Sequence, residues 1–199
     1  MITFSLNGQN VQYVGAETTP LLTYLREERG ITSVKDGCSG QAACGACLIE
    51  LDGKPALACS TPMKRVAGKE VVTIEGFPEN VRRNLARAFV AKGAVQCGYC
   101  TPGILSRAKI LLQDNSNPSR ADVIKALNAN VCRCTGYAKI VDAVLLAAQA
   151  LRENHEIAWE EKTGIGTCSI TSRPDSVTIS MTVVPSVRPT CARTRRPRA

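Results

Sequence analysis

The chain has one histidine and few aromatic residues, and each shortage counts against a class of site. His155 is the single histidine among 199 residues, and aromatic residues make up 4% of the total. A zinc-protease site of the HExxH type needs two histidines and is therefore excluded. Because bases stack on aromatic side chains, so few of them also argue against a surface for nucleic acid.

Long apolar runs are missing as well. No stretch approaches the roughly 18 consecutive apolar residues of a membrane-spanning helix. The opening residues, MITFSLNGQNVQYVG, show no basic segment followed by an apolar one. We therefore expect no membrane span, no secretory signal and a cytoplasmic location.

The net charge of +8 is unevenly distributed along the chain. Residues 160–199 carry seven Lys or Arg and three Asp or Glu, so this last fifth holds half of the net charge. Most of the excess lies in the final ARTRRPRA, and the rest of the chain shows no basic stripe with interleaved aromatics. A solvated basic tail explains this pattern better than nucleic-acid binding does.

Sequence periodicity divides the chain into three parts. Residues 1–76 combine strand-like alternation with one short helix, which predicts a small α+β domain of the β-grasp type. Residues 77–155 contain four segments of helical periodicity and predict a four-helix bundle. Residues 156–199 are rich in Pro, Ser, Thr and Arg without a sustained period, which predicts a linker or disordered tail.

What the chain does have is cysteine, ten residues in all. Since the cytosol keeps thiols reduced, so many cysteines are better explained as metal ligands than as disulfides. Eight of them fall into two groups of four. Cys168 and Cys191 stand apart in the tail, and the sequence assigns them no role.

The first group, Cys38, Cys44, Cys47 and Cys59, has the spacing C-x5-C-x2-C-x11-C. A plant-type [2Fe-2S] site uses C-x4-C-x2-C and a distant fourth cysteine. Three cysteines here crowd one glycine-rich loop, whose glycines permit close backbone approach and N–H groups directed at sulfur. Zinc prefers two separated pairs of ligands, so the pattern favours an iron-sulfur cluster over zinc or disulfides.

The second group comprises Cys97 and Cys100 in VQCGYCTPG and Cys132 and Cys134 in NVCRCTGY. Each pair precedes a predicted helix, so two helix N-termini would face one anionic centre. A Rieske centre is excluded for want of a second histidine. Zinc remains an alternative for this group taken alone, whereas its position after a ferredoxin-like loop favours a second cluster.

These stretches resemble a known family, the two-cluster iron-sulfur subunit or domain of molybdenum hydroxylases. The family includes xanthine dehydrogenases, aldehyde oxidoreductases and molybdenum-type carbon monoxide dehydrogenases. The similarity runs from about residue 2 to residue 152 and is carried by ITSVKDGC, CGACLIELDGKPALAC, QCGYCTPG and CRCTGYAKIVDAV. It implies a plant-type ferredoxin-like domain with a solvent-side [2Fe-2S] cluster on the first group. It also implies a four-helix domain with an inner [2Fe-2S] cluster on the second.

The resemblance further implies an electron-transfer role beside a molybdopterin held by a large subunit or by another domain. Gln96 would contact the pterin, and the loop carrying Cys134 would lie close to it. A FAD subunit and an external electron acceptor are further expected partners. The hydroxylation of an aldehyde or heteroaromatic ring would take place on the partner, because this chain carries no catalytic motif of its own.

The spacing of the first group departs from the family pattern, and the tail suggests a further hypothesis. Five residues separate Cys38 from Cys44, where the family usually has four, and we expect the extra residue, around 41–43, to bulge outward. In the tail, GIG…RPDSV resembles the segment that leads into the molybdenum domain of fused members. We hypothesise that the chain is a truncated or frameshifted product of such an enzyme.

Two other functions fit the same sequence. One is a free-standing ferredoxin-like carrier with two clusters that serves another oxidoreductase. The other is a zinc-stabilised interaction module. Association with a molybdenum-containing partner distinguishes the first alternative, and metal content distinguishes the second.

Overall fold

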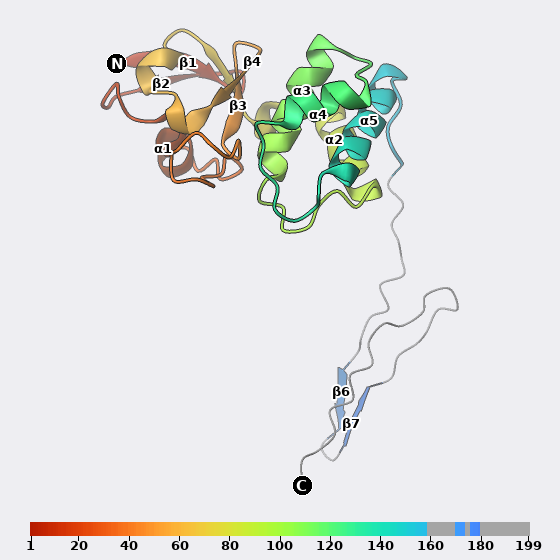
Figure 1. The fold of residues 1–199 in the computed structure, drawn as a ribbon. Helices are drawn as coiled ribbons and strands as arrows, with labels where there is room; N and C mark the ends of the chain where they lie inside the picture. Colours follow the sequence, from red (N-terminus) through yellow and green to blue (C-terminus); the bar gives the residue numbers. More distant parts are fainter. Residues whose placement is uncertain (159–169, 174–175, 180–199) are drawn as a thin grey trace. The chain divides into compact units, whose positions relative to one another are not determined.

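The computed structural model describes residues 1–158, 170–173 and 176–179. Residues 1–158 form one compact unit with a sheet in its first half and helices in its second (Figure 1). The α+β fold expected from the sequence is therefore confirmed. The domain boundary at residue 76 stays a prediction, because both halves belong to the same compact unit.

A five-stranded sheet with the order β2-β1-β5-β3-β4 forms the first half (Figure 1). Its strands are β1 Ile2–Leu6, β2 Gln9–Tyr13, β3 Leu48–Leu51, β4 Lys54–Leu57 and β5 Glu70–Val72. β1 pairs parallel with β5, and the other pairings are antiparallel. Between β3 and β4, Asp52 and Gly53 both have positive φ angles, +49° and +75°. This is the tight type I′ turn that an Asp-Gly pair favours.

A short helix packs against this sheet. Helix α1, Leu21–Thr23, continues as a π-helical turn, Tyr24–Glu28. Leu21, Tyr24 and Leu25 are buried in one core with the apolar strand residues. The Tyr24 ring meets the Phe4 ring edge to face, with centroids 5.7 Å apart. The helix thereby closes the core of the first half.

Four helices make up the second half, as the sequence predicts. They are α2 Glu79–Ala91, α3 Thr101–Asp114, α4 Arg120–Leu127 and α5 Ala138–Arg152. Ser119 and Asp122 form a reciprocal capping box at the start of α4, which satisfies backbone N–H groups that would otherwise lack partners. Leu85, Phe89 and Val144 lie in the apolar core shared by these helices.

Helix α3 joins the two halves by packing on strands β3 and β4. Lys109 of α3 forms an ion pair with Glu50 of β3, and both side chains are less than a tenth exposed. The Lys109 ammonium also lies 5.6 Å from the centroid of the Phe77 ring. Because α3 starts directly after Cys100 and β3 directly after Cys47, this packing brings the two cysteine groups together.

Beyond α5 the chain stays in contact with the helices for a few more residues. Ile157 is 9% exposed and belongs to the helical core, although the sequence analysis assigned residues 156–158 to the tail. In the tail itself, β6 Ile170–Arg173 and β7 Ser176–Ile179 pair antiparallel. Cys168, Cys191 and most of the GIG…RPDSV segment lie outside the described residues. None of the helices in the described part of the chain is long and apolar enough to cross a membrane.

Candidate metal centres

The first cysteine group gathers at one end of the sheet. Cys38 and Cys44 lie in the loop before β3 and are partly buried, and Cys47 directly precedes that strand. Cys59 lies in the short 3-10 turn that follows β4. Cys47 and Cys59 are 2% and 9% exposed. The structure therefore brings together all four predicted ligands of this group.

The thiols of this group approach one another in pairs, Cys38 with Cys44 and Cys47 with Cys59. Burial raises the pKa of the Cys47 thiol to about 12, and the neighbouring Cys59 thiol adds to the rise. The backbone N–H groups of Ala43 and Cys44 instead lower the pKa of Cys38. Such N–H groups would stabilise negative charge on metal-bound sulfur as well.

Two glycines allow the loop to fold closely around these sulfurs. A Cβ atom added to Gly37 would lie 3.0 Å from Cys44 Sγ. Gly45 has a φ of +69°, and a Cβ there would lie 2.2 Å from the carbonyl oxygen of Ala129. The Ala46 N–H donates to Cys44 Sγ across 3.5 Å. Four cysteines, a glycine cradle and backbone donors are the features that an anionic iron-sulfur cluster requires.

The loop between Cys38 and Cys44 is exposed where the sequence predicts an outward bulge. The side chains of residues 41–43 are exposed. Ser39, Gly40 and Ala42 all have positive φ angles, +50°, +78° and +55°. The exposure agrees with the expected outward bulge, and the left-handed Ala42 adds a backbone strain that the sequence did not reveal.

The second group gathers where two helices begin. Cys100 is the residue before the first turn of α3, and Cys132 and Cys134 lie in the loop that leads into α5. The Sγ atoms of Cys97 and Cys134 are 3.5 Å apart, and Cys100 and Cys132 form the other pair. All four predicted ligands are thus brought together here too, next to two helix N-termini.

The two pairs of the second group differ in burial. Cys97 and Cys134 are exposed, and the hydrogen bond from the Cys134 thiol to Cys97 raises the pKa of Cys134. Burial raises the pKa of the Cys100 thiol to about 12. Burial also acts to raise the pKa of Cys132, but the Thr135 hydroxyl and nearby N–H groups outweigh it and lower that pKa. One pair therefore faces the interior and the other faces the surface.

The pairing bears on the kind of metal centre. In both groups the four thiols divide two and two. A [2Fe-2S] cluster has four protein ligands for two irons. The paired thiols match that division.

Three contacts that the sequence analysis missed connect the two groups. The N–H of Val131 donates to the carbonyl oxygen of Cys44 across 2.8 Å. The side-chain amide of Asn130 donates to Gly45 O at 3.0 Å, and the Tyr99 hydroxyl donates to Asp36 O at 2.6 Å. In the sequence, these three residues are distinguished only by lying close to cysteines. The loops of the two groups therefore touch directly.

The surface beside the second group is exposed and partly apolar. Gln96 is exposed next to Cys97, as a residue that contacts a partner must be. Val95, Tyr99 and Val131 are between 41% and 55% exposed. The exposed Cys97 and Cys134 thus lie within a patch that another protein surface could cover.

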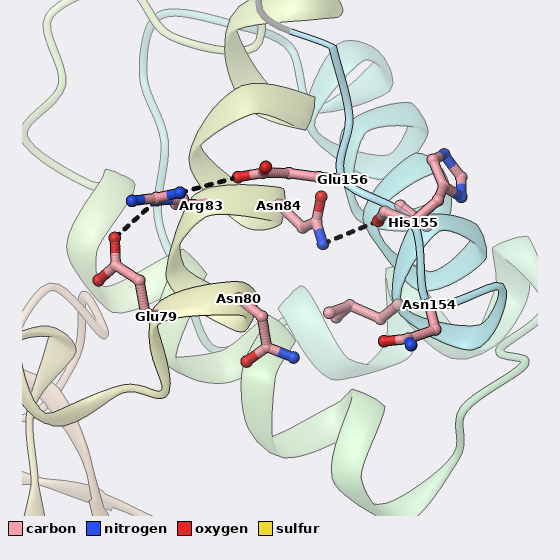
Figure 2. Close-up of a pocket in the computed structure, with 9 residues that line it drawn as sticks. Glu79, Asn80, Arg83, Asn84, Asn154, His155 and Glu156 are labelled. Carbon is pink, nitrogen blue, oxygen red and sulfur yellow. Dashed lines mark hydrogen bonds and ion pairs between the residues drawn. The ribbon is translucent and has the colours of Figure 1, made fainter.

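A separate hollow lies at the opposite end of α5 (Figure 2). It is bordered by Glu79, Asn80, Arg83 and Asn84 of α2, by the last turn of α5 and by the residues that follow that helix. No cysteine lines it, and the length of α5, about 20 Å, separates it from the loop of Cys134. It is therefore distinct from both cysteine groups.

Comparison with known families matches each half of the chain separately. Residues 4–64 match a "2Fe-2S iron-sulfur cluster binding domain" and residues 73–145 match a "[2Fe-2S] binding domain". Each of the two matched segments contains one complete cysteine group. The chain therefore contains two [2Fe-2S]-binding domains.

Individual relatives agree with this. The chain is 41% identical over 149 residues to the nicotinate dehydrogenase small FeS subunit of Eubacterium barkeri, covering 74% of this chain and 94% of that subunit. It is 48% identical over 154 residues to an aldehyde oxidoreductase of Megalodesulfovibrio gigas, covering 74% of this chain but 16% of the relative. Among solved structures, quinoline 2-oxidoreductase from Pseudomonas putida 86 superposes with a TM-score of 0.71 at 36% identity, covering 78% of this chain and 97% of the matched one.

Proposed function

The chain belongs to the family of iron-sulfur subunits and domains that carry two [2Fe-2S] clusters in molybdenum hydroxylases, and we propose that its two groups of four cysteines are the cluster ligands. The observation that carries this proposal is that each of the two segments matching a [2Fe-2S]-binding domain contains one complete group of four cysteines. The first cluster is held by Cys38, Cys44, Cys47 and Cys59, and the second by Cys97, Cys100, Cys132 and Cys134.

The bound clusters supply the electron transfer, since each can take up and release single electrons. The chain's own residues hold the clusters, direct backbone N–H groups at their sulfurs and exclude water from the buried thiols. The hydrogen bond from Val131 to the Cys44 carbonyl provides a short connection between the groups. With clusters bound, the second group, whose Cys97 and Cys134 are exposed, would be the side that receives electrons from a partner, and the first group would be the side that passes them to an external acceptor.

The exposed side of the second group faces the molybdopterin of a large subunit or of another domain. Gln96 contacts the pterin, and the Cys134 loop lies beside it. The exposure of both residues and of their apolar neighbours supports this assignment. A FAD subunit, which would pass electrons on to the acceptor, is a further partner. The assembly works in the cytoplasm.

Metal analysis with three single substitutions tests the ligand assignment. We expect about four irons and as much labile sulfide per chain, with two distinct S = 1/2 EPR signals after dithionite reduction. Cys47→Ser should remove one signal and Cys100→Ser the other, each with a loss of about two irons. Cys168→Ser, outside both groups, should leave iron content and spectra unchanged.

Two outcomes would overturn the proposal. Zinc without labile sulfide would identify a zinc-stabilised module. Two intact clusters in a chain that never co-purifies with a molybdenum-containing partner from its native host would identify a free-standing carrier. Retention of molybdenum with the tagged chain supports the hydroxylase assembly.

A further inference from the structure

Tyr99 reaches from the loop of the second cysteine group onto the loop of the first. It lies between Cys97 and Cys100, and its hydroxyl donates a 2.6 Å hydrogen bond to the carbonyl oxygen of Asp36. The ring covers Gly37, since a Cβ atom added there would lie 3.4 Å from the Cε1 atom of Tyr99. One side chain thus joins two segments that are 63 residues apart in sequence.

The peptide unit that Tyr99 binds lies next to Cys44, a predicted cluster ligand. The carbonyl of Asp36 and the N–H of Gly37 are the two ends of one planar peptide unit. The Gly37 backbone packs directly against the Cys44 sulfur, since a Cβ atom added to Gly37 would lie 3.0 Å from Cys44 Sγ. The Gly37 N–H is a backbone hydrogen-bond partner of that thiol. The Asp36–Gly37 peptide is therefore placed between the Tyr99 phenol and the Cys44 sulfur.

A hydrogen bond at one end of a peptide strengthens the donor at its other end. Chains of hydrogen bonds polarise one another, by about 10–30% per bond, and the phenol also fixes the orientation of the peptide plane. Hydrogen bonds to the cysteine sulfurs of an iron-sulfur cluster are among the features that set its reduction potential. Because such bonds stabilise the more negative, reduced state, strengthening one of them raises the potential.

We propose that Tyr99 is a positioning residue that raises the reduction potential of the first cluster. Its hydroxyl holds the Asp36–Gly37 peptide so that the Gly37 N–H is directed at the Cys44 sulfur. The proposal rests on the cluster assignment made above. A higher reduction potential at the first cluster would favour electron transfer from the second cluster to the first.

Tyr99→Phe tests this, because it keeps the ring on Gly37 and removes only the hydroxyl. The cluster-loaded full chain is titrated with redox mediators and followed by EPR, with the two signals assigned through the cysteine variants described above. We expect the midpoint of the first cluster to fall, so that its reduced-to-oxidised ratio at a fixed potential decreases about threefold. The midpoint of the second cluster should move less, although Tyr99 lies within its own loop.

Tyr13→Phe is the matched control. The Tyr13 hydroxyl bonds to Thr19 Oγ1 at 2.9 Å and to Ala16 O at 3.3 Å, on a strand that carries no cysteine. Like Tyr99→Phe, the Tyr13→Phe variant loses only a phenol oxygen. The midpoint potentials of both clusters should stay at their wild-type values. An unchanged first midpoint in Tyr99→Phe, or an equal shift in Tyr13→Phe, would overturn the proposal.

A second measurement separates tuning from a loss of structure. Proton ENDOR of the reduced first cluster, compared in H2O and D2O, should show a weaker coupling to one exchangeable proton in Tyr99→Phe, with iron content unchanged. Loss of iron in this variant would mean that Tyr99 only supports the loop, and the proposal would fail. If the wild-type chain lacks two [2Fe-2S] signals, the cluster assignment fails first, so the two failures are distinguishable.

Discussion

The backbone N–H of Val131 donates a 2.8 Å hydrogen bond to the carbonyl oxygen of Cys44. Cys44 belongs to the first cysteine group, and Val131 directly precedes Cys132 of the second. A path of a few covalent bonds and this hydrogen bond therefore leads from Cys44 to Cys132. Electron tunnelling decays less steeply through bonds than through empty space, so this contact is well placed for transfer between clusters.

Gly45→Ala should weaken that contact. The new Cβ atom would lie 2.2 Å from the carbonyl oxygen of Ala129, which the backbone can relieve only by separating the two loops. The positive φ adds about 1–2 kcal/mol of strain. We expect a smaller spin–spin splitting in the EPR spectrum of the fully reduced protein and slower electron transfer between the clusters.

Gly40→Ala provides the control for backbone strain. Gly40 lies in the same loop with a φ of +78°, and a Cβ atom there meets nothing within 4 Å. It should cost about 1–2 kcal/mol and leave the splitting as in the wild type. If both variants reduced the splitting equally, the contact through Gly45 would not be what couples the two centres.

The buried ion pair between Glu50 and Lys109 gives a prediction about the joint between the two halves. Glu50→Gln removes one charge and leaves the Lys109 ammonium buried without its partner, which costs about 3–5 kcal/mol. The double variant Glu50→Leu with Lys109→Met removes both charges and should recover most of that loss. The measurement is the urea concentration at which the visible absorbance of the clusters disappears. Equal losses in the single and double variants would contradict the buried pairing.

Ala42→Gly should stabilise the loop of the first group. Ala42 has a φ of +55°, and glycine adopts this conformation without the penalty of about 1–2 kcal/mol that other residues pay. Iron release to a chelator from the first cluster should therefore slow. The neighbouring Ala43→Gly should instead cost about 0.4–1 kcal/mol, because it only adds freedom to the unfolded chain. Effects of the same sign in both variants would show that Ala42 stores no strain.

Asn84 should be required to hold the end of the described helical unit in place. It is 4% exposed, and its amide donates to the carbonyl of His155 (Figure 2). Its oxygen accepts from the N–H of Ile157. Asn84→Ala leaves the Ile157 N–H buried without a partner, at a cost of about 1–3 kcal/mol. Hydrogen exchange at Ile157 should accelerate accordingly. Asn80→Ala, which changes an exposed amide on the same hollow, should leave the exchange rate unchanged.

Most of the architecture could be predicted from local patterns. Periodicity located α2 to α5, the Asp52–Gly53 pair located the turn between β3 and β4, and cysteine spacing separated the two groups. These features depend on near neighbours in sequence, such as a turn with two positive φ angles or one helical face. Short segments of the sequence are therefore enough to predict them.

What the sequence could not reveal depends on contacts between distant segments. Nothing near Glu50 indicates that its charge is buried against Lys109, 59 residues later. The irregular sequence around Ile157 predicts that it belongs to the tail, whereas in the structure Asn84 anchors it to α2. The contacts of Tyr99 and Val131 likewise depend on how α3 packs on β3. Such contacts are set by tertiary packing, which periodicity does not encode.

The anchor at Ile157 has a consequence for how such genes can be rearranged. Arg87 donates to the carbonyl of Ile157 at 2.8 Å, and Asn84 fixes the backbone on either side of Glu156. These contacts with α2 fix the end of the unit formed by residues 1–158. Among the relatives, one is a small separate subunit and another extends far beyond the shared region. A split or a join in the gene after Ile157 would therefore leave both cysteine groups, and the contacts between them, on the same side of the junction.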